Sequence, residues 1–352
     1  MRNKMGVLMM KKFRYIKILV LLLILLQLSF GTAPKIGTAA APQLLIPMGA
    51  RNVAMGGADI SSISGPEAAY WNPAGLGMVK NISFTANYMN YFADMNVTYL
   101  SAALNTGGLG VLGFSFQAID IGSWEQTTIN SPEGTGKMID PNYMTVGLSY
   151  AKRFTDRILF GANAKVISNS IENMKASGFG FDLGLQYITN FGFSMGITMK
   201  NYGGKMEWDG SDIEFDSDVE GANPNATTRK TKLIMGKADL PASMNIGIGY
   251  KYTINEEFNM NFASTFCNES YGINNLRYGT EGTYKDMVFL RAGYIQYLYP
   301  DDYPMDEESE YGVSFGGGIK LNLGGKDLFV DYAYRPMDTF DANQYFAISF
   351  GL

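Results

Sequence analysis

Charged side chains recur at the polar positions of segments that otherwise alternate apolar and small residues. In an extended strand, alternate side chains point to opposite faces, so these charges would share the face opposite to the apolar residues. Ion pairs that fill the space on this face are the main expectation, and the lining of a selective channel is the alternative. The residues that we assign to this charge network are Lys165, Asp182, Lys200, Arg277, Glu281, Arg291 and Asp331.

Arg291 and Glu281 form the ion pair that we predict most specifically. They belong to consecutive alternating segments, 276–284 and 287–299, which a short connection joins. Antiparallel pairing of these segments would place the two side chains next to each other as a brace. Exchanging both charges together should then restore any folding that either exchange alone loses.

The amino-acid composition gives little support for an enzyme. The 352 residues include no His and a single Cys, so neither a Ser–His nor a Cys–His pair is available. Two acid-rich segments, 203–240 and 300–310, lack the spacing of a regular calcium loop. We expect solvated loops there, with a calcium or partner-docking role as the alternative. Cys267 is expected to be a small buried filler, and no enzyme activity, metal or other cofactor is expected.

The first 40 residues have the order of a secretory signal peptide. A basic start is followed by the apolar run 18–30 and then by small residues up to Ala41. The run is too short for a spanning helix, so we expect export through the Sec pathway and cleavage near Ala39 or Ala40. Removal of this basic segment leaves a chain more acidic than the full-length net charge of −5. Nucleic acid is therefore not an expected partner.

From residue 81 onward, the chain repeats segments of about ten residues with the strand period of two. Apart from the first connection, which is short and lies near Ala93, the connections between them alternate between short turns and longer loops, as in outer-membrane barrels. The long ones lie near 122–141, 171–177, 203–240, 269–275, 300–310 and 336–343. The strands that we predict lie near 82–92, 95–104, 109–121, 142–154, 158–170, 178–188, 193–202, 241–253, 258–268, 276–284, 287–299, 311–322, 327–335 and 344–352.

This pattern predicts an all-β fold, a 14-stranded antiparallel transmembrane β-barrel in the outer membrane. The even strand number agrees with bacterial single-chain barrels, and hydrocarbon requires a sheet to close on itself. The chain divides into a signal peptide (1–40), a plug segment (41–80) and the barrel (81–352). A periplasmic cap or a linker is the alternative role for the middle segment, which lacks strand alternation.

The plug segment carries two motifs, GAR..AMGGA and YWNPAGL. Their residues are Gly49, Arg51, Met55, Gly56, Gly57, Tyr70, Trp71, Asn72, Pro73 and Gly75. The paired motifs resemble the start of the PorV/PorQ family, whose members are relatives of the FadL fatty-acid transporter fold. The resemblance continues through the late strands, for example in the Asp331-Tyr332-Ala333-Tyr334 sequence, although Gly282 stands where an aromatic residue is expected.

The resemblance implies a FadL-like barrel and two main functional hypotheses. The first is a component of type IX secretion that binds cargo C-terminal domains or a secretion channel and acts as a shuttle. The second is a transporter of hydrophobic small molecules, which predicts an apolar pocket near residues 43–60, including Leu44, Leu45, Ile46 and Met48. A simple diffusion pore or structural barrel is the third. In all three, outer-membrane lipid surrounds the barrel.

Overall fold

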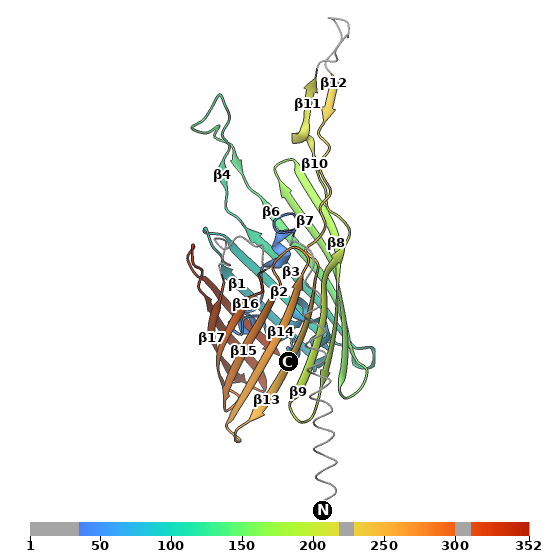
Figure 1. Cartoon of the computed structure of the whole chain (residues 1–352), viewed down its shortest axis with the longest axis vertical. Helices are drawn as coiled ribbons and strands as arrows, with labels where there is room; N and C mark the ends of the chain where they lie inside the picture. Colours follow the sequence, from blue (N-terminus) through green and yellow to red (C-terminus); the bar gives the residue numbers. More distant parts are fainter. Residues whose placement is uncertain (1–34, 218–228, 300–310, 352) are drawn as a thin grey trace, which may run out of the picture.

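The structure is a computed structural model and describes residues 35–217, 229–299 and 311–351. Most of the predicted signal peptide and the acid-rich segment 300–310 lie outside the described residues. Figure 1 shows a tall barrel of tilted strands with long hairpins at one end and short turns at the other. We call these the loop end and the turn end.

Within the described residues, fourteen antiparallel strands close into one barrel. Each strand pairs with its neighbours along the chain, and β1 pairs with β19 to close the sheet. The barrel strands are β1 (Ile82–Asn90), β2 (Asn96–Asn105), β3 (Val111–Asp120), β6 (Asn142–Arg153), β7 (Ile158–Ile171), β8 (Met174–Ile188), β9 (Phe193–Gly203), β13 (Ser243–Thr253), β14 (Phe258–Glu269), β15 (Asn275–Tyr284), β16 (Val288–Tyr297), β17 (Val313–Leu323), β18 (Lys326–Arg335) and β19 (Asn343–Gly351).

Alternation along each strand sets which side chains face outward. In β8, Phe179, Phe181 and Leu185 are exposed on the outside, whereas Asp182 and Gln186, at alternate positions, are buried in the interior. An apolar exterior with a polar interior is the arrangement that a bilayer requires, and closure leaves no unpaired strand edge in hydrocarbon. The predicted fold class is confirmed. Among the described residues, no helix is both long and apolar enough to cross a bilayer.

The strand ends follow the predicted pattern except at one hairpin. Apart from the start of β8, each predicted end lies within two residues of the observed one. The segment 171–177, predicted as a long loop, is instead a tight turn, because β7 continues to Ile171 and β8 begins at Met174. The side chains of Ile167 and Ala176 next to this turn are buried against Met206 and Leu240. This packing stabilises strand structure beyond the predicted boundary.

Two long connections build hairpins that project from the loop end (Figure 1). The connection after β3 contains β4 (Trp124–Glu125) and β5 (Met138–Ile139). The connection after β9 contains β10 (Trp208–Gly210), which pairs with β8, and the hairpin of β11 (Glu214–Ser217) and β12 (Arg229–Lys232). The sequence predicted loops here but not these strands.

Residues 42–79, here called the luminal segment, pack against the inner face of the barrel. Their short helices are η2 (Pro42–Leu45), α2 (Ala50–Ala54), α3 (Ala68–Trp71) and η3 (Pro73–Met78). Helix α2 contacts β16 to β19, and η3 contacts β3, β6, β7 and β8 on the other side of the barrel. The segment enters near Ile167 at the loop end and leaves through Val79 into β1 at the turn end. It therefore crosses the lumen.

Inward-facing glycines let the luminal segment lie directly against the strands. A Cβ atom on Gly293 of β16 would lie 2.1 Å from the Gly56 nitrogen, and one on Gly161 of β7 would lie 2.2 Å from the Pro73 carbonyl carbon. Neither glycine has a positive φ, so close approach of backbone, not strand conformation, excludes a side chain at these positions.

Candidate functional site

The first motif of the luminal segment builds a tight bend around α2. Gly49, Gly56 and Gly57 have φ angles of 87°, 67° and 73°, which favour glycine. Space is also limited, because a Cβ atom on Gly57 would lie 2.8 Å from the Trp71 ring. Met55 is fully buried in a small cluster with the barrel wall. These four residues hold the segment in shape.

Arg51 is the motif residue that reaches the barrel wall. Its Nε donates to Glu281 Oε2 at 3.1 Å, and its Nη2 donates to Glu281 Oε1 at 3.0 Å. This two-pronged ion pair ties α2 to strand β15 and is of the kind that guanidinium geometry favours. The alternation of the strand indicated that Glu281 faces inward, but not that a residue of the luminal segment would pair with it in addition to Arg291.

The second motif forms hydrogen bonds both within the luminal segment and to the barrel wall. Asn72 Nδ2 donates to the Ile60 carbonyl at 2.8 Å and to the Leu185 carbonyl of β8 at 3.2 Å, while its Oδ1 accepts from the Ala74 amide. Pro73 occupies the start of η3, where no amide hydrogen is needed. A Cβ atom on Gly75 would lie 2.2 Å from a main-chain oxygen. The motif is thus mainly architectural.

Tyr70 and Trp71 stabilise the fold of the luminal segment and also line a cavity. Trp71 Nε1 donates to the Met48 carbonyl at 2.6 Å, and the Tyr70 hydroxyl donates to the Leu44 carbonyl at 3.3 Å. Their rings meet edge to face with centroids 5.0 Å apart. Both rings line the cavity described below.

The predicted charge network separates into two clusters, and Arg277 lies outside both, paired with Glu269. In the first, Arg291 lies between two carboxylates: its Nε donates to Glu281 Oε2 at 2.6 Å and its Nη1 to Asp331 Oδ1 at 2.5 Å. The contact between Arg291 and Glu281 is the one that the sequence predicted. With Arg51 of α2, these residues form a chain of four charges, Arg51–Glu281–Arg291–Asp331, that joins β15, β16 and β18 across the intervening β17.

Two further acids of the luminal segment approach this first cluster. Asp59 lies 3.8 Å from Arg51, and burial raises the pKa of its carboxyl group. Glu67 is 8% exposed, and burial together with the neighbouring Asp331 carboxylate raises the pKa of Glu67 to about 7. Neither acid was predicted to approach the charge network, although an acid in a segment of small and apolar residues is itself a signal.

The second cluster is centred on Asp182 at an irregularity in the pairing of β8 with β9. Asp182 Oδ1 accepts from Lys165 Nζ at 2.8 Å and from the Asn201 amide at 2.7 Å, and Oδ2 accepts from Asn163 at 3.1 Å. Lys200, the next inward-facing cation, forms no ion pair with a described residue. Its Nζ instead lies 3.7 Å from the Tyr70 ring centroid.

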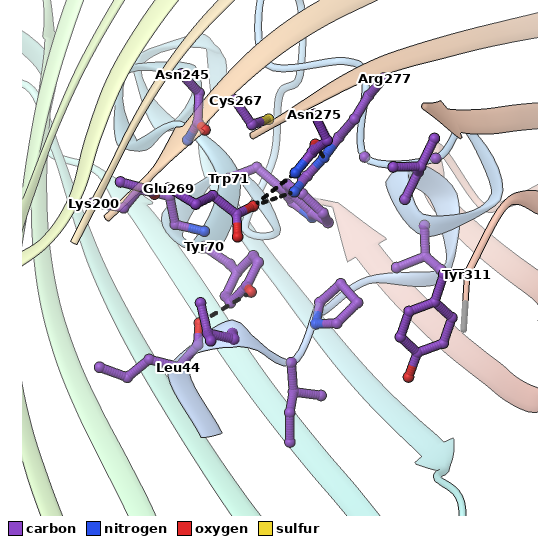
Figure 2. A pocket seen from close by; sticks show the side chains of 18 of the residues that line it. Leu44, Tyr70, Trp71, Lys200, Asn245, Cys267, Glu269, Asn275, Arg277 and Tyr311 are labelled. Carbon is purple, nitrogen blue, oxygen red and sulfur yellow. Dashed lines mark hydrogen bonds and ion pairs between the residues drawn. The ribbon is translucent and has the colours of Figure 1, made fainter. Parts of the chain in front are cut away.

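A cavity of about 370 Å³ lies between the luminal segment and the wall (Figure 2). Its apolar surface includes Leu44, Leu45 and Ile46, as the transporter hypothesis predicted, whereas Met48 is buried without lining it. Its polar surface comes from the strands, and Figure 2 shows Arg277 there with its bonds to Glu269 and Asn275. The polar lining residues on strands are Lys200, Asn201, Ser243, Asn245, Cys267, Glu269, Asn275, Arg277, Tyr297 and Arg335.

Two larger cavities lie on the other side of the luminal segment, toward the turn end. Their volumes are about 690 and 630 Å³, and both reach Arg51 and Glu281. The ion pair between these residues therefore lines the space at the turn end, whereas neither residue lines the first cavity. In the described part of the chain, no group of three or more His, Cys, Asp or Glu side chains is arranged to hold a metal ion.

Comparison with known proteins shows similarity at the level of fold. No protein-family model and no curated protein sequence matches the chain. The toluene transporter TbuX of Ralstonia pickettii superimposes with a TM-score of 0.55 at 13% identity, covering 86% of this chain and 97% of that one. The Pseudomonas putida toluene transporter TodX gives 0.52 at 14% identity, covering 86% and 97%.

A Pseudomonas aeruginosa FadL homologue superimposes with a TM-score of 0.50 at 14% identity, covering 87% of this chain and 98% of that one. At such identities the likeness concerns the fold. The chain therefore has the FadL-like fold of outer-membrane barrels, and its function has to be argued from its own residues.

Proposed function

We propose that this protein is an outer-membrane transporter of small hydrophobic molecules, exported through the Sec pathway. The observation that carries the proposal is the cavity of about 370 Å³ inside the barrel, with apolar walls supplied by the luminal segment. Ligand sites have this volume and this mixture of apolar surface with a few polar groups. The solved proteins of similar fold that are described as toluene transporters favour the same class of ligand.

The position of the luminal segment defines how such a transporter would work. A molecule that enters from the loop end reaches the cavity, where Ile46 and Val53 offer apolar contact. Onward movement to the turn end requires the segment to shift, since α2 and η3 contact opposite sides of the wall. The Arg51–Glu281 ion pair is the charged contact between α2 and the wall that would resist this shift, together with hydrogen bonds such as that from Asn72 to the Leu185 carbonyl. No catalytic step belongs to this proposal.

A second candidate, the secretion component that the PorV/PorQ resemblance implies, is favoured by the projecting hairpins. Phe215, Leu233 and Ile234 on the β11–β12 arm are exposed, Ile234 to 95%. Exposed apolar residues on an arm outside the barrel suit contact with another protein. The solved structures of similar fold support the transporter more than this role, which reverses the order of the two hypotheses from the sequence.

An uptake measurement separates the two candidates. Cells that lack other hydrocarbon channels would be given radiolabelled toluene, with and without this protein in the outer membrane. The transporter proposal predicts faster uptake with the protein and a return to background in Ile46→Trp, which fills the cavity. Leu112→Trp, on the exposed outer face, is the matched control. Unchanged uptake, together with recovery of a secretion channel in a pull-down of the intact barrel, would favour the second candidate.

A further inference from the structure

Lys200 is a buried cation that the described residues leave without an anionic partner. Its side chain is on β9 and is 8% exposed. The carboxylate on the neighbouring strand, Asp182, already accepts from Lys165, Asn163 and the main chain of Asn201. Lys200 therefore faces the cavity without a direct ion pair to any described residue.

Aromatic contacts offset only part of the cost of burying this charge. The Lys200 ammonium lies 3.7 Å from the Tyr70 ring centroid and 5.4 Å from that of Trp71. A cation–π contact is weaker than the hydration that a buried ammonium loses. Lys200 thus destabilises the empty protein, and a residue with such a cost at a cavity is a candidate for ligand binding.

The charges around the cavity favour an anion. Three cations and one carboxylate line it among the described residues: Lys200, Arg277, Arg335 and Glu269. Arg277 is compensated, because its Nη2 donates to Glu269 at 3.1 Å and its Nε to Asn275 at 2.8 Å. The surplus positive charge is therefore on Lys200 and on Arg335, which stacks on Tyr311.

The apolar part of the lining favours a flat, rigid body on the ligand. Aromatic side chains on several sides line the cavity, and rings of this kind make stacked or edge-to-face contacts with an aromatic guest. Figure 2 shows the Lys200 side chain reaching toward Tyr70, with Leu44 next to the Tyr70 hydroxyl. The aromatic lining residues are Tyr70, Trp71, Tyr91, Tyr297 and Tyr311.

We propose that the cavity binds an aromatic carboxylate, whose carboxylate group pairs with Lys200 and whose ring packs against Tyr70 and Leu44. This inference rests on the proposed transport function and names its ligand class. A neutral hydrocarbon such as toluene would leave the Lys200 ammonium desolvated and unpaired, so it should bind the apolar wall more weakly than the carboxylate binds. The ligand expected here therefore differs in charge from toluene.

The test compares binding of three probes to the purified full-length barrel: 4-tert-butylbenzoate, its neutral amide 4-tert-butylbenzamide, and undecanoate. We expect the benzoate to bind about 10- to 100-fold more tightly than the amide, the range of one charge-assisted hydrogen bond. Lys200→Met should abolish this preference, and Lys200→Arg should retain it. Lys200→Met should also raise the unfolding midpoint of the ligand-free barrel, since it removes an unpaired buried charge.

Lys165→Met is the matched comparison, because Lys165 is equally buried but paired with Asp182. It should lower the unfolding midpoint, in contrast to Lys200→Met, and it should weaken the preference for the benzoate, because the freed Asp182 carboxylate can then pair with Lys200. Equal affinity for benzoate and amide, or tighter binding of undecanoate, would overturn the proposal while leaving hydrophobic transport intact. Failure of all three probes and of toluene to bind would instead contradict the proposed function itself.

Discussion

Substitution of Gly293 by alanine tests whether the luminal segment depends on direct backbone contact with the wall. The added Cβ would lie 2.1 Å from the Gly56 nitrogen and 2.2 Å from the Met55 carbonyl carbon. Ordinary contacts between such atoms are about 3.5–4.0 Å. The segment or the strand must therefore move by more than an ångström, and no side-chain rotation can relieve a contact between backbone atoms.

The size of the effect follows from the nature of this contact. Overpacking of a well-packed interior costs about 1–3 kcal/mol, and a contact between rigid backbones belongs at the upper end. Because each 1.4 kcal/mol changes a population tenfold, Gly293→Ala should raise the undocked population of the segment by about 100-fold. The barrel strands should remain paired, since Gly293 has no positive φ that alanine would strain.

Labelling of a buried thiol measures this population. Ala58 is fully buried in the luminal segment, so Ala58→Cys in a Cys267→Ser background would react with a membrane-impermeant maleimide only when the segment is undocked. We expect the labelling rate to rise about 100-fold with Gly293→Ala. Gly282→Ala on β15 is the control, because its new Cβ meets nothing nearer than Met260 Sδ at 3.4 Å. Equal rates for the two variants would refute the packing argument.

Three further predictions concern the polar contacts of the luminal segment. Glu281→Gln should destabilise the protein by about 3–5 kcal/mol in urea unfolding, because Arg51 and Arg291 lose a shared buried partner; a loss below 1 kcal/mol would contradict this. Asn72→Leu should cost about 1–3 kcal/mol in the same assay, since the Ala74 amide loses its acceptor and the Ile60 carbonyl keeps only its bond from Gln186; wild-type stability would show that the Asn72 bonds are dispensable. Glu67 has a pKa raised to about 7 in the docked state, so its contribution to docking should be full below pH 4.5 and should decline as the pH rises to about 7. Thiol labelling should therefore be faster at pH 8 than at pH 5. Part of this difference comes from ionisation of the thiol itself, and Glu67→Gln should remove only the remainder.

The structure also changes the expected result of a charge exchange between Glu281 and Arg291. If the two residues paired only with each other, exchanging both would restore folding. In the observed chain of charges, an arginine at position 281 would face Arg51, and a glutamate at position 291 would face Asp331. We now expect the double exchange to remain destabilised, because it creates two like-charge contacts for the one pair that it restores.

The barrel could be predicted from the sequence because the patterns that specify it lie within each strand and in the connections next to it. Alternation of the kind seen around Asp182 assigns each residue to one face, and the lengths of the connections order the strands. The extension of β7 and β8 could not be predicted, since it depends on burial of Ile167 and Ala176 against Met206, which is remote in sequence. The projecting β11–β12 hairpin likewise lacks the long alternating segment that marks a barrel strand.

For the candidate site, the sequence predicts which side chains face the lumen but not which of them pair with each other. Parity placed Lys165, Lys200 and Glu281 inside, but it does not determine which cation reaches which carboxylate. Asp182 pairs with Lys165 and not with Lys200, and it lies at a local irregularity between β8 and β9 that alternation alone does not predict. The role of Arg51 required knowledge of how the luminal segment lies in the lumen, and that depends on long-range contacts such as Gly56 against Gly293.

The most direct test of the transport account is native mass spectrometry of the barrel purified from its own outer membrane, with bound small molecules identified after release. The account predicts one hydrophobic molecule per barrel, retained in Leu112→Trp and lost in Ile46→Trp, which fills the cavity at its apolar wall. A barrel that carries no small molecule, or a molecule whose occupancy is unaffected by Ile46→Trp, would contradict the claim that this cavity is the ligand site.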